Sequence, residues 1–304
     1  KQAYVPVSAT VIQNKVGTAP ILWFDKGEKI LISMPGVPFE MKTTMRDDII
    51  PRLQSQFQPD RYLKRTYLVS GITESALATR LSGFETLLPA GFTLAYLPSF
   101  GFIRLRLSAW GEARKPEIKQ LGRRLKLLLG NEYVARSEKT LEALLGEKLR
   151  KQQLTVSTAE SCTGGYIAHR ITSVSGASDY FEGSIVTYDN RIKEELLNVD
   201  KQTIESHGVV SREVVEKMAQ NVALKLGTQC SIAVSGIMGP EGGTREKPVG
   251  TAWVCTKYAD EIISVEYHVG SSREENIERT ANLAILQLIR MLSVRPDAAS
   301  AGNL

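Results

Sequence analysis

Apolar residues recur at helical spacing through the second half of the chain, between short runs that suit strands. A strand-like run over residues 154–157 precedes a helix with Ile167, Ile171 and Val174 on one face. Residues 231–234 form a continuous apolar strand. Strands and helices alternate in this part, which predicts a layered α/β fold with the site in loops at the strand ends.

Changes in this pattern divide the chain into parts of different character. We expect a partial domain over residues 1–57, a small α+β module over 58–112, a linker helix over 113–136, the α/β domain over 137–294, and a flexible tail over 295–304. The first part is short and begins abruptly, so we expect the first half of its domain to be missing from this chain.

Local patterns predict the elements of the smaller parts. The first part has a hairpin over residues 21–24 and 29–33, followed by a Gly/Pro-rich loop over 34–41. The module that follows has strands over 62–69, 93–97 and 103–109 and a helix over 73–81; further helices are expected over 116–129 and 137–151. The middle module is therefore α+β.

Composition narrows the class of protein. Apolar residues make up 42% of the 304 residues, which is ample for packed cores, and neither a membrane-spanning run nor a signal-peptide pattern is present. Cys162, Cys230 and Cys255 lack metal-ligand spacing, so we expect no disulfide framework and no zinc site. These features favour a cytoplasmic protein. The net charge of +5 includes a local excess over residues 114–126, which we interpret as a solvated helix face before a nucleic-acid patch.

Residues 158–165 carry the strongest chemical signal, because they place Ser161 and Cys162 beside Gly164 and Gly165 at the start of a helix. N–H groups and the positive end of the helix dipole gather there, and glycines let a phosphate or an oxyanion approach the backbone. A structural explanation competes with this one. Serine and threonine are ordinary N-caps, and glycine is common in turns.

Two further loops strengthen the chemical interpretation. Residues 235–243 form a second glycine-bearing loop after a strand, without a Walker or dinucleotide-binding pattern. After another strand, Tyr188 supplies a phenol and Lys193 an amine that could act as base for Ser161 if burial keeps it neutral. Cys162 with a histidine is the second possible chemistry, although none of the three histidines has a marked context: His169, His207 and His268.

Together these motifs resemble the C-terminal domain of the CinA family. The matching stretches are residues 158–165, 186–193, 207–211, 235–243 and 247–251. In that family this domain is a nicotinamide mononucleotide deamidase, which releases ammonia and forms nicotinic acid mononucleotide. Upstream, residues 14–20 and 35–41 look like the later part of the family's molybdopterin-binding-like domain, and the middle module resembles its KH-like module without the Gly-x-x-Gly loop.

The resemblance implies roles for individual residues. Ser161 is the nucleophile, Lys193 the general base and Tyr188 an assistant, while an attack by water oriented by the same residues stays open. Substrate contacts are expected at Thr163, Gly164, Gly165, Asn190, Ser235, Gly236, Gly239, Gly242, Gly243 and Arg273. Residues 270–273 read Gly-Ser-Ser-Arg where the family commonly has Gly-Asp-Arg, so the acidic residue that precedes the arginine in the family is missing here.

The same resemblance implies the cofactors and partners. The deamidase reaction needs no cofactor, and a divalent metal ion is expected only for a complete N-terminal domain. The expected partners are a small nucleotide substrate and a second copy of the chain, without membrane or nucleic acid. A non-catalytic competence-associated protein that binds nucleotides or nucleic acid is the alternative function.

Overall fold

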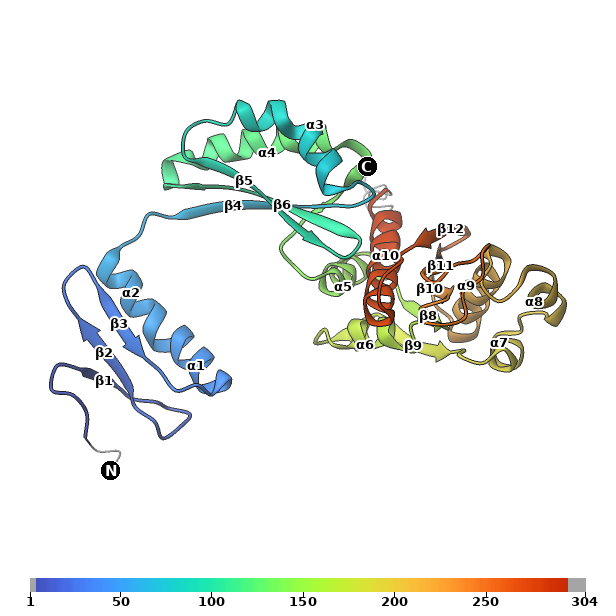
Figure 1. Cartoon of the computed structure of the whole chain (residues 1–304), viewed down its shortest axis with the longest axis horizontal. Helices are drawn as coiled ribbons and strands as arrows, with labels where there is room; N and C mark the ends of the chain where they lie inside the picture. The colour runs from blue at the N-terminus through green and yellow to red at the C-terminus, as the bar shows by residue number, and fades with distance from the viewer. Residues whose placement is uncertain (1–3, 295–304) are drawn as a thin grey trace, which may run out of the picture. The chain divides into compact units, whose positions relative to one another are not determined.

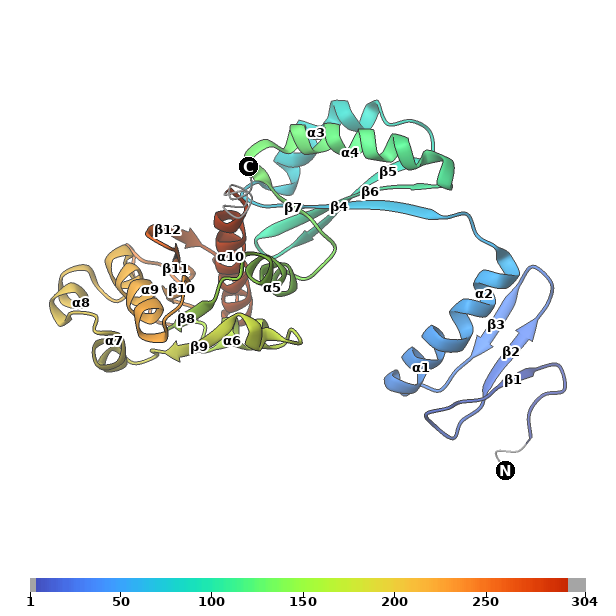
Figure 2. The same cartoon turned by 180° about the vertical axis from the view of Figure 1, so that it is seen from behind.

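The computed structural model describes residues 4–294, in which residues 4–62 and 63–294 form two compact units (Figures 1 and 2). The tail predicted to be flexible, residues 295–304, lies outside the described residues. No helix among residues 4–294 is long and apolar enough to cross a membrane.

The first unit is a small antiparallel sheet with helices. Its elements are β1 (Thr10–Ile12), β2 (Ile21–Asp25), β3 (Ile30–Ser33), α1 (Pro38–Thr44), a π-helical turn (Met45–Ile49) and α2 (Ile50–Phe57). Ile12, Ile21, Trp23 and Ile49 form its buried core. The predicted hairpin is confirmed as β2 and β3. The predicted loop over 34–41 is wrong in its second half, because Pro38 begins α1, where its fixed φ suits a first turn.

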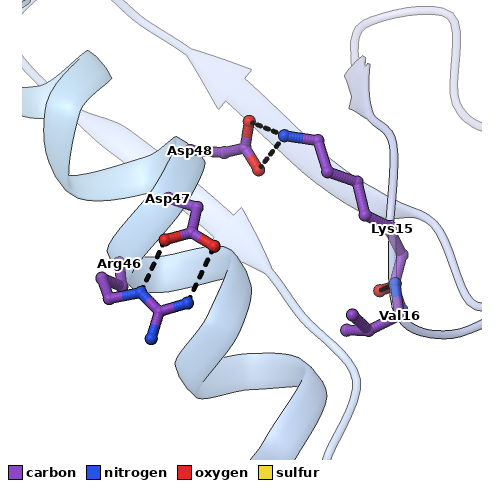
Figure 3. A network of polar contacts seen from close by, with 6 residues as sticks. Lys15, Val16, Arg46, Asp47 and Asp48 are labelled. Atoms are coloured by element: carbon purple, nitrogen blue, oxygen red, sulfur yellow. Dashed lines mark hydrogen bonds and ion pairs between the residues drawn. The ribbon is translucent and has the colours of Figure 1, made fainter.

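A network of ion pairs fastens the β1–β2 loop of this unit to its helical segment (Figure 3). The Lys15 ammonium lies 3.1 Å from both carboxylate oxygens of Asp48. Arg46 donates to Asp47 from two nitrogens, and this hydrogen bonding lowers the pKa of the Asp47 carboxyl. Exposed pairs of this kind add little stability. The Lys15–Asp48 pair links the loop to the helical segment, while the apolar core holds the unit together.

The middle part of the chain forms a four-stranded sheet in the order β5-β6-β4-β7. Its elements are β4 (Tyr62–Val69), α3 (Glu74–Thr86), β5 (Phe92–Ser99), β6 (Phe102–Trp110), α4 (Lys115–Leu129) and β7 (Tyr133–Arg136). Both helices cover one face of the sheet, where Leu81 and Leu125 pack with Leu105 (Figure 1). The predicted strands and helices are confirmed, except that the linker helix expected over residues 113–136 ends at Leu129. β7 is an addition that the sequence pattern missed, since four residues show too little alternation.

The rest of the second unit is a five-stranded sheet flanked by helices. Its elements are α5 (Leu141–Gln152), β8 (Val156–Glu160), α6 (Tyr166–Thr172), β9 (Phe181–Val186), α7 (Asn190–Leu197), α8 (Lys201–His207), α9 (Arg212–Leu226), β10 (Cys230–Gly236), β11 (Thr251–Tyr258), β12 (Glu261–His268) and α10 (Arg273–Val294). The strand order is β12-β11-β10-β8-β9. β8 is parallel to both β9 and β10, whereas β11 runs antiparallel to its two neighbours.

Alternating side chains on the central strands enter different cores on the two faces of this sheet. Ile232 and Val234 belong to a cluster with the apolar residues of α5, α6 and α10. Ala233 belongs to a second cluster with the apolar face of α9. The predicted three-layer α/β fold is therefore confirmed, with α10 and α9 on opposite faces of the sheet.

The two sheets of the second unit share part of their packing. Leu68, Phe102 and Val134 of the smaller sheet join the cluster that contains Leu145 of α5. From α10, Arg290 donates to the Ser70 carbonyl and hydroxyl, both at 2.8 Å. These contacts make residues 63–294 one compact unit, and the finer boundaries at 112 and 136 stay a prediction.

Candidate functional site

The sheet topology brings the three predicted motifs to one edge. β8, β9 and β10 are parallel, and they end at Glu160, Val186 and Gly236. The carboxyl ends of parallel strands meet at the same edge of a sheet, where ligands of open α/β folds bind. Because Thr251 pairs with His268 in β11 and β12, the start of α10 reaches this edge as well.

The side chain of Glu160 caps the N-terminal end of α6. The carboxylate is fully buried and accepts hydrogen bonds from the N–H groups of Gly165, Ile167 and Ala168 at 2.8–3.1 Å. It also accepts one from the Thr163 hydroxyl at 2.7 Å. A carboxylate of the chain therefore already occupies the positive end of this helix. The sequence pattern had favoured these N–H groups as donors to a ligand, and the structure assigns them to Glu160 instead.

We expect Glu160→Gln to destabilise the protein, because one carboxylate oxygen becomes an NH₂ group that cannot accept the bonds now made by backbone N–H donors. Hydrogen bonds to charged groups contribute about 1.5–3 kcal/mol, so the free energy of unfolding should fall by about 2 kcal/mol. Urea denaturation measures it. Glu182→Gln, at an exposed position on β9, is the matched control. Equal stability of the two variants would contradict the capping role.

Ser161 lies at the turn that leaves β8 and is 9% exposed. Its N–H donates to Val234 at 3.1 Å, and its carbonyl accepts from Gly164 at 3.2 Å. Gly164 has a φ of +59° and faces open space, since a Cβ there would meet nothing within 4 Å. Of the three predicted ligand contacts in this turn, Gly164 is thus the one that faces outward, whereas Thr163 and Gly165 contact Glu160.

Lys193 is buried at the start of α7 with 1% of its surface exposed. Its ammonium donates to the Thr187 carbonyl at 2.7 Å and lies 3.5 Å from the Asn190 side-chain oxygen. The Thr187 N–H in turn donates to the Glu160 carbonyl at 2.7 Å, so Thr187 links this amine to the end of β8. Burial lowers the pKa of the Lys193 amine below its ordinary value.

Cys162 is buried within the same turn. Burial, with a smaller contribution from the Glu160 carboxylate, raises the pKa of its thiol to about 12. A thiol is the weaker nucleophile because the thiolate is the reactive form. His169 stacks on the Tyr166 ring, and His207 lies 3.7 Å from Glu213. These contacts and the raised pKa of the thiol disfavour the alternative chemistry of Cys162 with His169 or His207.

Tyr188 and Arg273 meet across two loops. Tyr188, 64% exposed, accepts a hydrogen bond from the Arg273 guanidinium at 3.0 Å. A second guanidinium nitrogen donates to the Gly239 carbonyl at 2.8 Å. The positive charge of Arg273 offsets a small part of the rise in the pKa of the Cys162 thiol. Without the acidic neighbour common in the family, Arg273 joins the β9–α7 loop to the β10–β11 loop.

The second glycine loop is shaped largely by its own packing. A Cβ on Gly236 would lie 2.8 Å from the Thr251 carbonyl, and one on Gly243 would lie 2.7 Å from the Val249 nitrogen. Gly239, with a φ of +82°, would press a Cβ to 2.5 Å from Val249. Gly242, also at positive φ, has the most space of the four. Close backbone approach within the loop accounts for most of these glycines; their contact with a substrate stays a prediction.

Ser235 makes a structural contact on β10. It is 1% exposed, and its hydroxyl donates to the Val209 carbonyl at 2.7 Å. Lys247 extends this connection, because its ammonium donates to the carbonyls of His207 and Val210. The loop after β10 is thereby fixed to the turn before α9. The predicted substrate contact of Ser235 is not tested by this arrangement.

Comparison with known proteins places this arrangement in a family. The family model for the CinA C-terminal domain matches residues 138–292. The chain belongs to the CinA family. A CinA-like protein of Cytophaga hutchinsonii is 43% identical over 95% of this chain and 70% of its own length, and one of Flavobacterium psychrophilum is 42% identical over 93% and 69%. Among solved structures, a competence/damage inducible protein from Agrobacterium tumefaciens is 35% identical over 50% of this chain and 95% of its own, with a TM-score of 0.48.

Two buried polar residues of this CinA-family chain escaped the sequence prediction of its site. Glu160 was counted only as part of a motif. Asn276 on α10 is fully buried and holds the β10–β11 loop by donating to the Met238 carbonyl at 3.0 Å, while it also exchanges hydrogen bonds with Ser271. A polar side chain on the apolar face of a helix was the available signal. Among residues 4–294, no group of three or more His, Cys, Asp or Glu side chains could hold a metal ion.

Proposed function

We propose that this chain is an amidohydrolase that converts nicotinamide mononucleotide to nicotinic acid mononucleotide and ammonia. The observation that supports it most is the buried amine of Lys193, which has a lowered pKa and is linked through Thr187 to Glu160, the residue before Ser161, at the carboxyl edge of the parallel strands. A lysine that is neutral near physiological pH can accept a proton from a serine hydroxyl. Family membership is consistent with this proposal.

In the first half of the proposed reaction, the Ser161 oxygen attacks the carboxamide carbon as its proton passes to the neutral Lys193 amine. The carboxamide oxygen becomes an oxyanion. Within residues 4–294, the N–H groups of Cys162 and Thr163 donate to no other residue, so they are the donors that we assign to it. Lys193 then returns the proton to the leaving nitrogen, and ammonia departs from an acyl-serine.

In the second half, Lys193 takes a proton from water, and the hydroxide attacks the acyl carbon. Collapse of the second tetrahedral intermediate breaks the bond to the Ser161 oxygen, which recovers its proton from Lys193 and releases the carboxylate product. Tyr188 and Arg273, joined by their hydrogen bond, are assigned to orient the substrate beside this turn. Gly164 faces open space and leaves room for the phosphate or ribose.

The direct test is an assay with nicotinamide mononucleotide that follows ammonia and nicotinic acid mononucleotide in parallel. We expect equal amounts of both products. Binding of the mononucleotide without turnover would instead support the non-catalytic alternative. The absence of both binding and turnover would contradict the proposal. A homodimer and a cytoplasmic location are parts of the same proposal, which sedimentation and cell fractionation would check.

We expect Cys162→Ala to keep most of the deamidase activity. The thiol is buried and its pKa is raised to about 12, so it supplies almost no thiolate at neutral pH. The assay is the rate of ammonia release, with Cys255→Ala as the control for loss of a buried thiol elsewhere in the sheet. A loss of rate confined to Cys162→Ala, with unchanged stability, would move the nucleophile from Ser161 to the cysteine.

A further inference from the structure

A hollow lies in the 63–294 unit, between the smaller sheet, α4 and α5. Its volume is about 580 Å³, within the usual range for small-molecule sites. Six basic side chains and one carboxylate line it: Arg65, Arg123, Lys126, Arg136, Lys148, Lys151 and Glu147. Lys148 and Lys151 belong to the end of α5, which leads into the first residue of β8. The hollow is thus at the opposite end of that strand from Ser161.

The three arginines of this hollow lack a carboxylate partner among the described residues. Its carboxylate, Glu147, pairs with Lys139 at 2.9 Å. Within the described range 4–294, Arg65, Arg123 and Arg136 form no ion pair. Arginines that line one hollow without ion-pair partners concentrate a positive potential that favours a multiply charged anion. Their planar forks match the geometry of phosphate oxygens.

The wall of the hollow also carries a hydroxyl that lacks a partner. Tyr67 is 2% exposed, and its hydroxyl makes no hydrogen bond within residues 4–294. It fits against Gly122, where any Cβ would collide with the hydroxyl and approach the Arg65 side chain. Beside it, the Lys126 ammonium lies 4.8 Å from the centre of the Tyr133 ring. A buried hydroxyl without a partner is costly. A ligand oxygen that reached this wall could accept its hydrogen bond.

We propose that this hollow binds a ligand with two or more linked phosphate groups, supplied either by inorganic polyphosphate or by a nucleotide. The middle module contributes the arginines and Lys126, and α5 contributes two lysines. The ligand would therefore contact the middle module and α5 at the same time. The basic side chains surround one hollow of limited volume, which favours a small anion over a long nucleic-acid strand. This site is independent of the reaction proposed at Ser161.

The test is calorimetric titration of the whole chain with tripolyphosphate, ADP and a single-stranded oligonucleotide. Arg123→Glu and Arg136→Ala should each weaken tripolyphosphate binding by about tenfold or more, as expected for loss of a charge-assisted contact. Arg124→Glu is the matched control, because Arg124 is exposed on the same helix but does not line the hollow. It should change the affinity little.

Comparison of the three titrations distinguishes inorganic polyphosphate from a nucleotide as the ligand. Tripolyphosphate and ADP binding with similar affinity supports recognition of phosphates alone, and tighter binding of ADP supports a nucleotide. No binding of either by the unmodified chain would overturn the proposal. An oligonucleotide that binds more tightly than tripolyphosphate, and is weakened equally by Arg123→Glu and Arg124→Glu, would overturn it in favour of a nucleic-acid surface.

Discussion

Replacing Ser161 with alanine is expected to lower the turnover of nicotinamide mononucleotide by roughly 10³-fold or more, as for other hydrolases that lose a nucleophile. The change removes the attacking oxygen and little else. Among residues 4–294, Ser161 forms its hydrogen bonds through its backbone, to the Val234 carbonyl and from the Gly164 N–H, so the turn should keep its shape. Steady-state ammonia release measures the loss, and calorimetry should find the affinity for the mononucleotide nearly unchanged.

The control for this change is Ser173→Ala, at an exposed position just after α6, which should turn over normally. Mass spectrometry of the quenched native enzyme should find an acyl group on the peptide that contains Ser161. If Ser161→Ala kept more than about a tenth of the rate, the covalent route would be abandoned. Direct attack by water, oriented by Lys193, would then be the better mechanism.

The layered fold was predictable because the apolar residues that recur at regular spacing in the sequence are the residues that are buried in the structure. Ile167 and Ile171, which share a face of the predicted helix, are both almost fully buried. The pattern failed where burial is absent. α8 (Lys201–His207) has no buried residue, so no apolar repeat in the sequence predicts this helix. The helix predicted from residue 137 begins at Leu141 instead, because the Thr140 side chain caps it by accepting from the Ala143 N–H.

The candidate site was predictable as a set of loops but not as a set of contacts. Three strands followed by polar residues were enough to expect a common edge. The occupation of the α6 start by Glu160 was not predictable in the same way. It depends on the Glu160 side chain, the last of β8, pointing toward the N-terminal end of α6. A sequence motif does not show in which direction a side chain points. Placement of the Lys193 amine against the Thr187 carbonyl likewise required the backbone of both segments.

Replacing Lys193 with methionine is expected to lower deamidase turnover by a factor of about 10²–10⁴, the usual contribution of a general base. Methionine keeps much of the length of the side chain but cannot accept a proton. In the native enzyme, the fraction of neutral amine grows as pH rises, so kcat/KM should climb with pH and level off. Because burial lowers the pKa of Lys193, that plateau should begin below the pH at which an ordinary lysine loses its proton. A pH profile of both proteins measures this.

The same substitution should change stability in the opposite sense. A folded state that lowers the pKa of Lys193 binds fewer protons than the unfolded chain, so the native protein becomes more stable as pH rises from the lowered pKa toward the ordinary value. Lys193→Met removes the cost of burying the charge and should therefore raise the free energy of unfolding most at neutral pH, with the difference shrinking in alkali. Lys217→Met, exposed on α9, is the control. An unchanged rate and an unchanged pH profile would exclude Lys193 as the base, since methionine offers the reaction no other group that titrates.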